Sequence, residues 1–140
     1  MKRGALLVLS VILVCSYLFG GTPPTAVQKT FIEKYQTATN ISWEKEDNNE
    51  WEVEFKFDGT NLTANFAENG AWIDSKMEMK IADSPTAILE TINSIYSGWT
   101  LSEIVKKETS KQGTVYDVDL KKRTEKLKVT FKEDGTKVAD

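Results

Sequence analysis

The sequence predicts an α+β domain formed by a tandem repeat, in which each unit is one helix followed by a four-stranded antiparallel meander. Two observations lead to this prediction. Apolar residues recur at every fourth position in two short segments, which is typical of helices that bury one side. After each segment the pattern changes to strict alternation of apolar and polar residues, which is typical of strands with one buried face. We therefore expect two layers, with the helices packed on one face of the sheet.

Two helices are predicted, one at the start of each unit. PTAVQKTFIEKY begins at Pro24 and carries a stripe of apolar residues spaced by four: Val27, Phe31 and Tyr35. PTAILETINSIY begins at Pro85 and carries the equivalent stripe 61 residues on: Ile88, Ile92 and Tyr96. Ser84 is in position to cap the second helix, with proline in the first turn, and Gly98 is in position to end it.

The strands that follow each helix also repeat. WEVEFKF at 51–57 alternates apolar with charged residues, and YDVDL at 116–120 repeats this pattern 65 residues later. The next strand repeats at the same distance, first as Leu62, Ala64 and Phe66 and then as Leu127, Val129 and Phe131. A shorter strand is expected before each pair, at 41–46 and 103–108. The turn at 69–70 corresponds to the turn at 134–135, so a fourth strand is expected after each.

These segments, taken in order, resemble a known protein family. PTAV, WEVEF and FAENGAW in the first unit, followed by IYSGW, YDV and FKEDG in the second, are similar to the PepSY-like, beta-lactamase-inhibitor-like family of exported bacterial proteins. The resemblance extends from Pro24 to Val138 and lies in the order and doubling of the segments. It implies the fold, an exported location, and inhibition or protein binding as the function. It implies no catalytic residue.

The start of the chain has the pattern of a secretory signal. Lys2 and Arg3 precede an apolar run at 5–14, which at roughly 10 residues suits a signal peptide better than a membrane-spanning helix. We expect a signal peptide at 1–21 and a single domain at 22–140, made of two PepSY-like repeats at about 24–81 and 84–139. The protein would then be periplasmic or secreted. Cys15 leaves a second interpretation open, a lipoprotein anchored at this residue.

Composition argues against several kinds of chemistry. Without Lys2 and Arg3 the chain has 16 basic and 21 acidic residues, a balance that does not favour nucleic acid as a partner. The chain has no histidine, and its single cysteine lies in the signal region. The usual general base and the usual zinc ligands are therefore missing from the mature sequence. We expect no metal, no cofactor and no enzymatic activity. The expected partner is a protein or peptide, with a membrane contact only if Cys15 is lipidated.

Hairpin geometry predicts one candidate binding surface. A two-residue turn at 69–70 is expected to pair Ala67 with Trp72 on the face of the sheet that the helices leave uncovered. A second turn, at 59–60, is expected to bring Glu52 next to Ala67. Trp72 would then be an aromatic residue among polar neighbours, as in many interfaces, so Trp72, Ala67 and Glu52 are candidate binding residues. The alternative is a tryptophan that a loop covers or that is simply tolerated at the surface.

The same pairing assigns other residues to the two faces. Phe66 pairs with Ile73, and Phe131 with Val138, on the core side. The uncovered face of the second unit is expected to carry charged residues: Asp117, Asp119, Lys121, Lys128, Lys132 and Lys137. Trp43 and Trp51 are expected in the core. Trp99 follows the second helix and either fills the seam between the units or lines a groove there, which makes it the last candidate binding residue.

These observations favour a non-catalytic exported binding module, inhibitor-like by resemblance. It would contact another envelope or secreted protein through the uncovered sheet face or the groove between the repeats. One alternative is a small hydrolase using the carboxylates of Glu52 and Glu54, or those of Asp117 and Asp119, which lie about 6.6 Å apart on one strand face. Another is a lipid-anchored structural protein of the envelope, which would require processing at Cys15.

Overall fold

The computed structural model describes residues 20–139 of the chain. Cys15 and nearly all of the predicted signal peptide at 1–21 lie outside the described residues. The elements follow one another in this order: α1, Thr25–Lys34; β1, Thr39–Lys45; β2, Glu50–Phe57; β3, Thr60–Ala67; β4, Trp72–Glu78; the short 3₁₀ helix η1, Ile81–Asp83; α2, Thr86–Ile95; β5, Thr100–Thr109; β6, Gly113–Lys122; and β7, Glu125–Phe131. We refer to residues 24–81 as the first half and to residues 84–139 as the second half.

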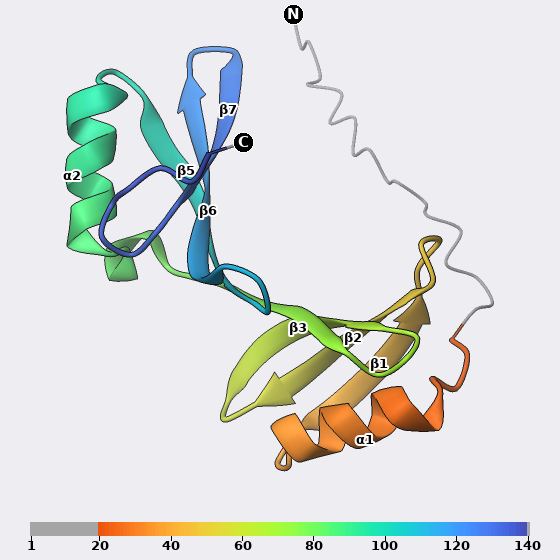
Figure 1. Cartoon of the computed structure of the whole chain (residues 1–140). Coiled ribbons are helices and arrows are strands. Elements are labelled where there is room, and N and C mark those ends of the chain that lie inside the picture. The colour runs from red at the N-terminus through yellow and green to blue at the C-terminus, as the bar shows by residue number, and fades with distance from the viewer. Residues whose placement is uncertain (1–19, 140) are drawn as a thin grey trace, which may run out of the picture.

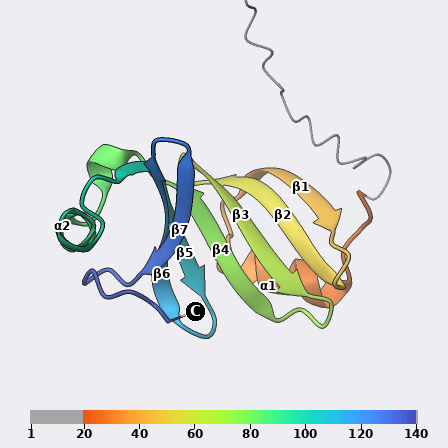
Figure 2. The same cartoon turned by 90° about the horizontal axis from the view of Figure 1, so that it is seen from above.

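The predicted α+β class is confirmed, with two helices and one antiparallel sheet among the described residues. Within residues 20–139, seven strands form one antiparallel sheet and follow one another across it from β1 to β7 (Figure 2). The first half supplies β1 to β4 and the second half supplies β5 to β7, so the backbone crosses from one half to the other between β4 and β5. Figure 1 shows α1 against the strands of the first half and α2 against those of the second.

Both helices lie on the same face of the sheet, as expected. Residues that pair directly across antiparallel strands point to the same face. Ala64, Ser75 and Glu108 form one such row from β3 to β5. Ala64 packs in the core beneath α1, whereas Ile104, four residues before Glu108 on β5, packs in the core beneath α2. The second face of the sheet is therefore the one that neither helix covers, and we call it the open face.

Each half has its own apolar core. The first core joins the stripe of α1 to alternate residues of β2 and β3, namely Val27, Phe31, Tyr35, Trp51, Val53, Phe55, Ala64 and Phe66. The second joins the stripe of α2 to β5, β6 and β7, namely Ile88, Ile92, Ile104, Tyr116, Val118, Leu120, Val129 and Phe131. Trp51 is buried and Trp43 packs against the first core, where its ring centroid lies 5.2 Å from that of Phe31, so both are core residues as predicted.

The second helix begins differently from the prediction. Pro85 itself occupies the N-cap position of α2, and no side chain caps the helix. Ser84 is not the cap, because its hydroxyl donates to the carbonyl of Ile81 at 2.6 Å and closes η1 instead. The helix is held by its apolar stripe, since Ile88 and Ile92 are both buried.

The hairpin between β3 and β4 has a different loop from the one predicted. Gly70 N donates to Ala67 O at 2.9 Å, and Ala67 N donates to Ala71 O at 2.8 Å. The loop therefore has three residues, 68–70, with Gly70 at φ +92° in the left-handed position that such loops require. A β-bulge follows. Phe66 pairs with Trp72 and Asn65 pairs with Asp74, so Ile73, which lies between Trp72 and Asp74, is the extra residue on β4.

This loop changes the face on which the following residues lie. The predicted pairs Ala67–Trp72 and Phe66–Ile73 are both wrong, because a slip of one residue moves a side chain to the opposite face. Phe66 is fully buried beneath α1, as expected, but Ile73 is half-buried and belongs to neither core.

The hairpin between β2 and β3 also differs from the prediction, but without exchanging the faces. Its two-residue turn is formed by Asp58 and Gly59, both with positive φ, and not by residues 59–60. The register is therefore shifted by two positions. Glu52 pairs with Asn65, and the predicted position of Glu52 next to Ala67 is wrong.

The second half ends in three strands, so the fourth strand predicted for it is wrong. Lys132 N donates to Thr136 O at 2.8 Å, which repeats the loop of the first half. Beyond the loop only one bridge forms, from Phe131 to Lys137, which places Lys137 across from a core residue and not among the open-face charges. In the first half β4 is held by β3 on one side and β5 on the other, whereas the segment after Gly135 has only β7 as a neighbour.

Candidate functional site

The open face is built from the polar residues that alternate with the core residues along each strand. Glu50, Glu52 and Glu54 alternate with the buried residues of β2. Asp117, Asp119 and Lys121 alternate in the same way with the buried residues of β6. Because the helices cover only the opposite side, this face presents charged side chains over the whole width of the sheet.

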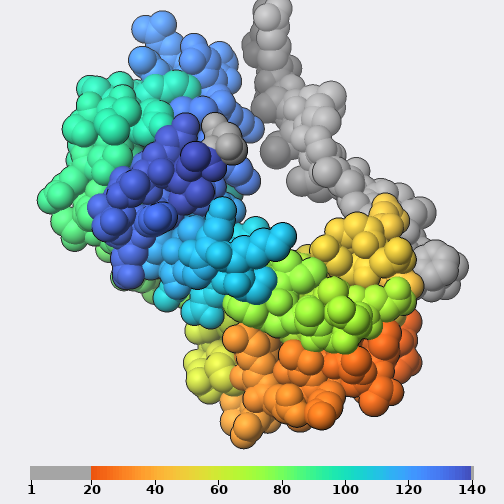
Figure 3. Space-filling view, viewed as in Figure 1, coloured from red at the N-terminus to blue at the C-terminus, as the bar shows by residue number. Residues whose placement is uncertain are grey.

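The open face is concave. The sheet twists so strongly that the two halves form separate lobes whose uncovered sides turn toward one hollow (Figures 1 and 3). Two shallow recesses of about 560 Å³ lie on this side. One is lined by residues of β2, β3 and β4 with Glu103 and Val105 of β5, and the other lies over β5, β6 and β7. A smaller recess between them contains Lys76, Val105 and Asp117, so the concave surface is continuous from one half to the other.

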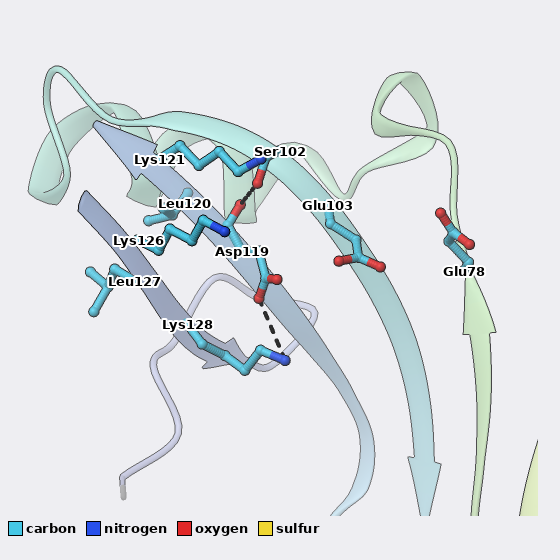
Figure 4. A pocket seen from close by; sticks show the side chains of 9 residues that line it. All are labelled: Glu78, Ser102, Glu103, Asp119, Leu120, Lys121, Lys126, Leu127 and Lys128. Carbon is cyan, nitrogen blue, oxygen red and sulfur yellow. Dashed lines mark hydrogen bonds and ion pairs between the residues drawn. The ribbon is translucent and has the colours of Figure 1, made fainter. Parts of the chain in front are cut away.

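The recess in the second half has a basic wall and an acidic wall. Lys121, Lys126 and Lys128 project from β6 and β7, whereas Glu78 and Glu103 project from β4 and β5 (Figure 4). Lys121 pairs directly with Lys126 across the two strands, and like charges in directly opposite positions are unfavourable. Neither lysine makes an ion pair within residues 20–139.

One lysine of the basic wall, Lys128, already forms an ion pair. Lys128 Nζ lies 3.6 Å from Asp119 Oδ1, and Ser102 donates to the backbone carbonyl of Asp119 at 3.0 Å. The charge that remains available to a ligand at this end of the open face is therefore that of Lys121 and Lys126.

The opposite end of the open face is acidic. Glu44 pairs with Glu52 across β1 and β2, so two carboxylates lie side by side, and Glu54 follows on the same face. Burial raises the pKa of the Glu52 carboxyl, the charge of Glu46 raises it further, and Lys76 lowers it. None of these four glutamates makes an ion pair in the part of the chain that the structure describes.

A buried polar group joins the two halves at the centre of the open face. Asn65 Nδ2 donates to Asp74 Oδ1 at 2.8 Å, and Lys107 Nζ lies 3.2 Å from Asp74 Oδ2. Asn65 and Asp74 are each only 8% exposed. Asp74 lies on β4 and Lys107 on β5, so this ion pair connects the two halves in addition to the backbone hydrogen bonds.

Trp72 does not lie on the open face, contrary to the prediction. It pairs with the buried Phe66 and packs against the first core. Its indole Nε1 donates to Ser75 Oγ at 2.9 Å, and Lys34 Nζ of α1 lies 4.1 Å from the centre of its ring. The three-residue loop is the cause, because it turns Trp72 toward the helix.

The structure separates the remaining predicted binding residues. Ala67 and Glu52 are both on the open face, although they are not neighbours, since Ala67 pairs with Glu50. Trp99 packs against the second core, and Lys122 Nζ lies 5.9 Å from the centre of its ring. Trp99 therefore lies at the end of α2 within the second half and does not fill the seam between the halves.

Sequence reasoning missed several residues of the site. Lys126 was not expected on the open face, although its spacing of two from Lys128 on one strand would have placed it there. Asn65 and Lys107 were not identified because each pairs with Asp74 only once β4 is aligned with its two neighbours. No local pattern in the sequence indicates that contact. In residues 20–139 no group of side chains is suited to hold a metal ion.

The fold matches solved structures. No family model and no curated protein matches the chain. A BLIP-like protein from Bacteroides fragilis matches with a TM-score of 0.76 and 24% identity, over 85% of each chain. A DUF2874 family protein from Bacteroides ovatus matches with a TM-score of 0.76 and 19% identity, over 86% of this chain and 87% of that one.

A third solved structure, described as a candidate periplasmic protein from Bacteroides eggerthii, matches with a TM-score of 0.72 and 17% identity. The match covers 85% of this chain and 88% of that one. No helix in residues 20–139 is long and apolar enough to span a bilayer. The chain thus has the fold of these BLIP-like and DUF2874 proteins, in agreement with the resemblance of its sequence to the PepSY-like, beta-lactamase-inhibitor-like family.

Proposed function

We propose that the protein is a non-catalytic, exported binding module that contacts another envelope or secreted protein through its open face. One observation carries this proposal. The sheet has a concave, uncovered face with an acidic end and a basic end, and Glu44, Glu52, Glu54, Lys121 and Lys126 on it make no ion pair among residues 20–139. Concave surfaces with unpaired charge suit a convex partner of complementary charge.

The chemistry of the partner follows from this division. Glu44, Glu52 and Glu54 favour a partner surface with lysine or arginine, whereas Lys121 and Lys126 favour one with aspartate or glutamate. The two lysines oppose each other directly, so a carboxylate placed between them relieves their repulsion. The description of the B. fragilis protein as BLIP-like supports the proposal of an inhibitor-like role for this chain.

We further propose that the chain is a single domain at 22–140 made of two PepSY-like repeats, at about 24–81 and 84–139. The supporting observation is a repeated contact between a turn and a helix. A side chain at Gly70 would meet Ala26 in the first turn of α1, and a side chain at Gly135 would meet Ala87 in the first turn of α2. Ala87 lies 61 residues after Ala26, which is the offset of the two helix stripes.

The proposed location is the periplasm or the exterior of the cell, with a lipoprotein anchored at Cys15 as the alternative. The description of the B. eggerthii protein as a candidate periplasmic protein supports this location. The other functional alternative, a hydrolase using Glu52 and Glu54, stays a prediction.

Capture of a partner from the native envelope fraction, followed by titration with the purified partner, tests the proposed function. Two variants reverse the charge at the ends of the open face: Glu52→Lys with Glu54→Lys, and Lys121→Glu with Lys126→Glu. We expect each to weaken binding by more than about tenfold, because like charges are brought together across the interface. Binding of the wild type should weaken as salt is added.

The matched control exchanges Lys29 and Glu33, which form an exposed ion pair on α1 at 3.9 Å, away from the open face. Lys29→Glu with Glu33→Lys keeps the net charge and should leave binding unchanged. The proposal fails if both open-face variants bind as the wild type does, or if the control loses binding to the same extent.

A further inference from the structure

We propose that a groove on the helix-covered side binds a small molecule with an apolar body about the size of one aromatic ring and a neutral oxygen that accepts a hydrogen bond. We call this the junction groove. It is lined chiefly by Tyr35, Phe57, Leu62, Ser75, Met77 and Lys106. This inference is independent of the function proposed for the open face.

The junction groove exists because neither helix covers the centre of the sheet. Met77 pairs with Lys106 and Ser75 pairs with Glu108, so these four residues of β4 and β5 share the face on which the helices lie. Neither apolar core includes them. The groove has a volume of about 290 Å³, near the lower limit for sites that hold small molecules.

The apolar part of the groove is only partly covered by the described chain. Phe57, Leu62 and Met77 are each half-buried. Phe57 and Leu62 contact the edge of the first core, while Met77 lies outside both cores. An aromatic ring in the groove would cover the exposed parts of all three side chains, which is the usual source of affinity in small-molecule sites.

At the polar end of the groove, one hydroxyl hydrogen of the Tyr35–Ser75 pair has no acceptor in the described chain. Trp72 Nε1 donates to Ser75 Oγ, and a second hydrogen bond joins Ser75 Oγ to the Tyr35 hydroxyl, with either oxygen able to donate. The two hydroxyl groups have two hydrogens, and their mutual bond uses one. The other has no acceptor among residues 20–139, although Tyr35 is only 6% exposed and Ser75 only 4%. A ligand oxygen would supply that acceptor.

The charges at the rim favour a neutral ligand. Burial raises the pKa of the Tyr35 phenol and the charge of Glu108 raises it further, so the phenol keeps its proton at neutral pH. The groove is lined by two acidic residues, Asp58 and Glu108, and two basic residues, Lys76 and Lys106, so its charges balance and favour neither an anion nor a cation. An ether, an ester or an alcohol fits these conditions better than a carboxylate or an amine.

The test compares two probes of similar shape, benzyl methyl ether and propylbenzene, of which only the ether has an oxygen. Binding is followed by the indole N–H signals in ¹H–¹⁵N spectra, with the Trp72 signal assigned by Trp72→Phe. We expect both probes to shift the Trp72 signal and to leave that of Trp99 in place. We also expect the ether to bind about three- to tenfold more tightly, which is the usual effect of one neutral hydrogen bond.

Variants distinguish the contribution of the two hydroxyl groups to binding from that of the rest of the groove. Tyr35→Phe combined with Ser75→Ala removes both hydroxyls and should abolish the preference for the ether. The control is Tyr96→Phe, which alters the equivalent tyrosine of the second half, outside the groove, and should change neither affinity. If the double variant does not fold, Met77→Trp fills the groove from its half-exposed side and should abolish binding of both probes.

The proposal is overturned if neither probe shifts the Trp72 signal at its solubility limit, or if the ether and the hydrocarbon bind equally to the wild type. It is also overturned if Met77→Trp binds both probes as the wild type does.

Discussion

Gly70 and Gly135 show how single residues determine the fold. Each has a positive φ, and each lies in a three-residue loop that rests on the first turn of a helix. A Cβ atom at Gly135 would lie 2.5 Å from Ala87 O and 2.7 Å from Thr91 Oγ1. Thr91 also donates to the carbonyl of Gly135 at 3.0 Å. These glycines therefore permit both the loop and the contact between the loop and the helix.

Gly135→Ala should destabilise the protein much more than Gly59→Ala. Both glycines have φ +82°, so both substitutions incur the same backbone strain, about 1 kcal/mol. Only Gly135 also has backbone within reach of the new methyl group, whereas Gly59 has nothing within 4 Å. We expect the free energy of unfolding in urea to fall by a further 1–3 kcal/mol, roughly, for Gly135→Ala. Equal losses for the two variants would contradict the role assigned to the loop–helix contact.

Glu52 illustrates how the open face affects stability through charge. Its raised pKa means that the folded state holds the proton more tightly than the unfolded state. The folded state therefore loses stability as the pH rises from the ordinary value of 4.5 through the raised value. The acidic end of the open face is thus unfavourable for folding at neutral pH in the absence of a partner.

Glu52→Gln should accordingly raise the free energy of unfolding at about pH 7, by less than about 1 kcal/mol because water screens this half-exposed group. The gain should shrink as the pH falls and vanish near pH 3, where the carboxyl of the wild type is protonated in both states. Urea unfolding over this pH range is the measurement. Glu54→Gln, which removes the same charge from an exposed position of the same strand, is the control. A gain independent of pH would contradict the explanation.

At the scale of the elements, the helices and most strands could be predicted because their patterns are local. The stripes that include Phe31 and Ile92, and the alternation along β2 and β6, depend only on residues within one element. The turn of the β2–β3 hairpin was misplaced by one residue toward the C-terminus. The Asp58-Gly59 pair nevertheless carries the composition of a two-residue turn. That error shifted the register by two positions and left the faces correct.

The β3–β4 hairpin could not be predicted in the same way. Asn69-Gly70 fits both a two-residue turn and the end of a three-residue loop, and the local sequence does not distinguish them. The structure has the longer loop, in which Gly70 rests against Ala26 of α1. This contact is between residues far apart in the sequence. A single-residue error here was enough to place Trp72 on the wrong face and to assign the binding surface to a residue that packs beneath a helix.

At the scale of the whole molecule, the backbone pairing between the two halves within residues 20–139 is that of β4 with β5. Each helix packs over its own half, and the buried residues of each core come from one half, although Met79 of the first half packs against the second core. The ion pair between Asp74 and Lys107 adds a side-chain contact that holds the halves together. Asp74 is nearly buried, so loss of its cation would leave a charge in a poorly hydrated position.

Lys107→Met keeps the apolar stem of the side chain and removes only the charge that pairs with Asp74. We expect it to lower the free energy of unfolding by about 2 kcal/mol, because Asp74 then has no cation. Lys128→Met is the matched control, since the pair of Lys128 with Asp119 is far more exposed and should contribute less than about 0.5 kcal/mol. Urea unfolding of both variants provides the comparison. Similar losses for the two would show that the pair at the junction has no special role.

The alternation of side chains along the strands has a consequence for protein engineering. The exposed residues of β2, β3, β6 and β7 that alternate with the core residues reach the concave surface, so replacing them changes recognition and leaves the packing in place, whereas Asn65 and Val115 are buried on this face and should be kept. Such a separation makes the chain a scaffold on which new specificities can be selected from combinatorial libraries, with Val53 and Val118 kept as fixed positions on the other side.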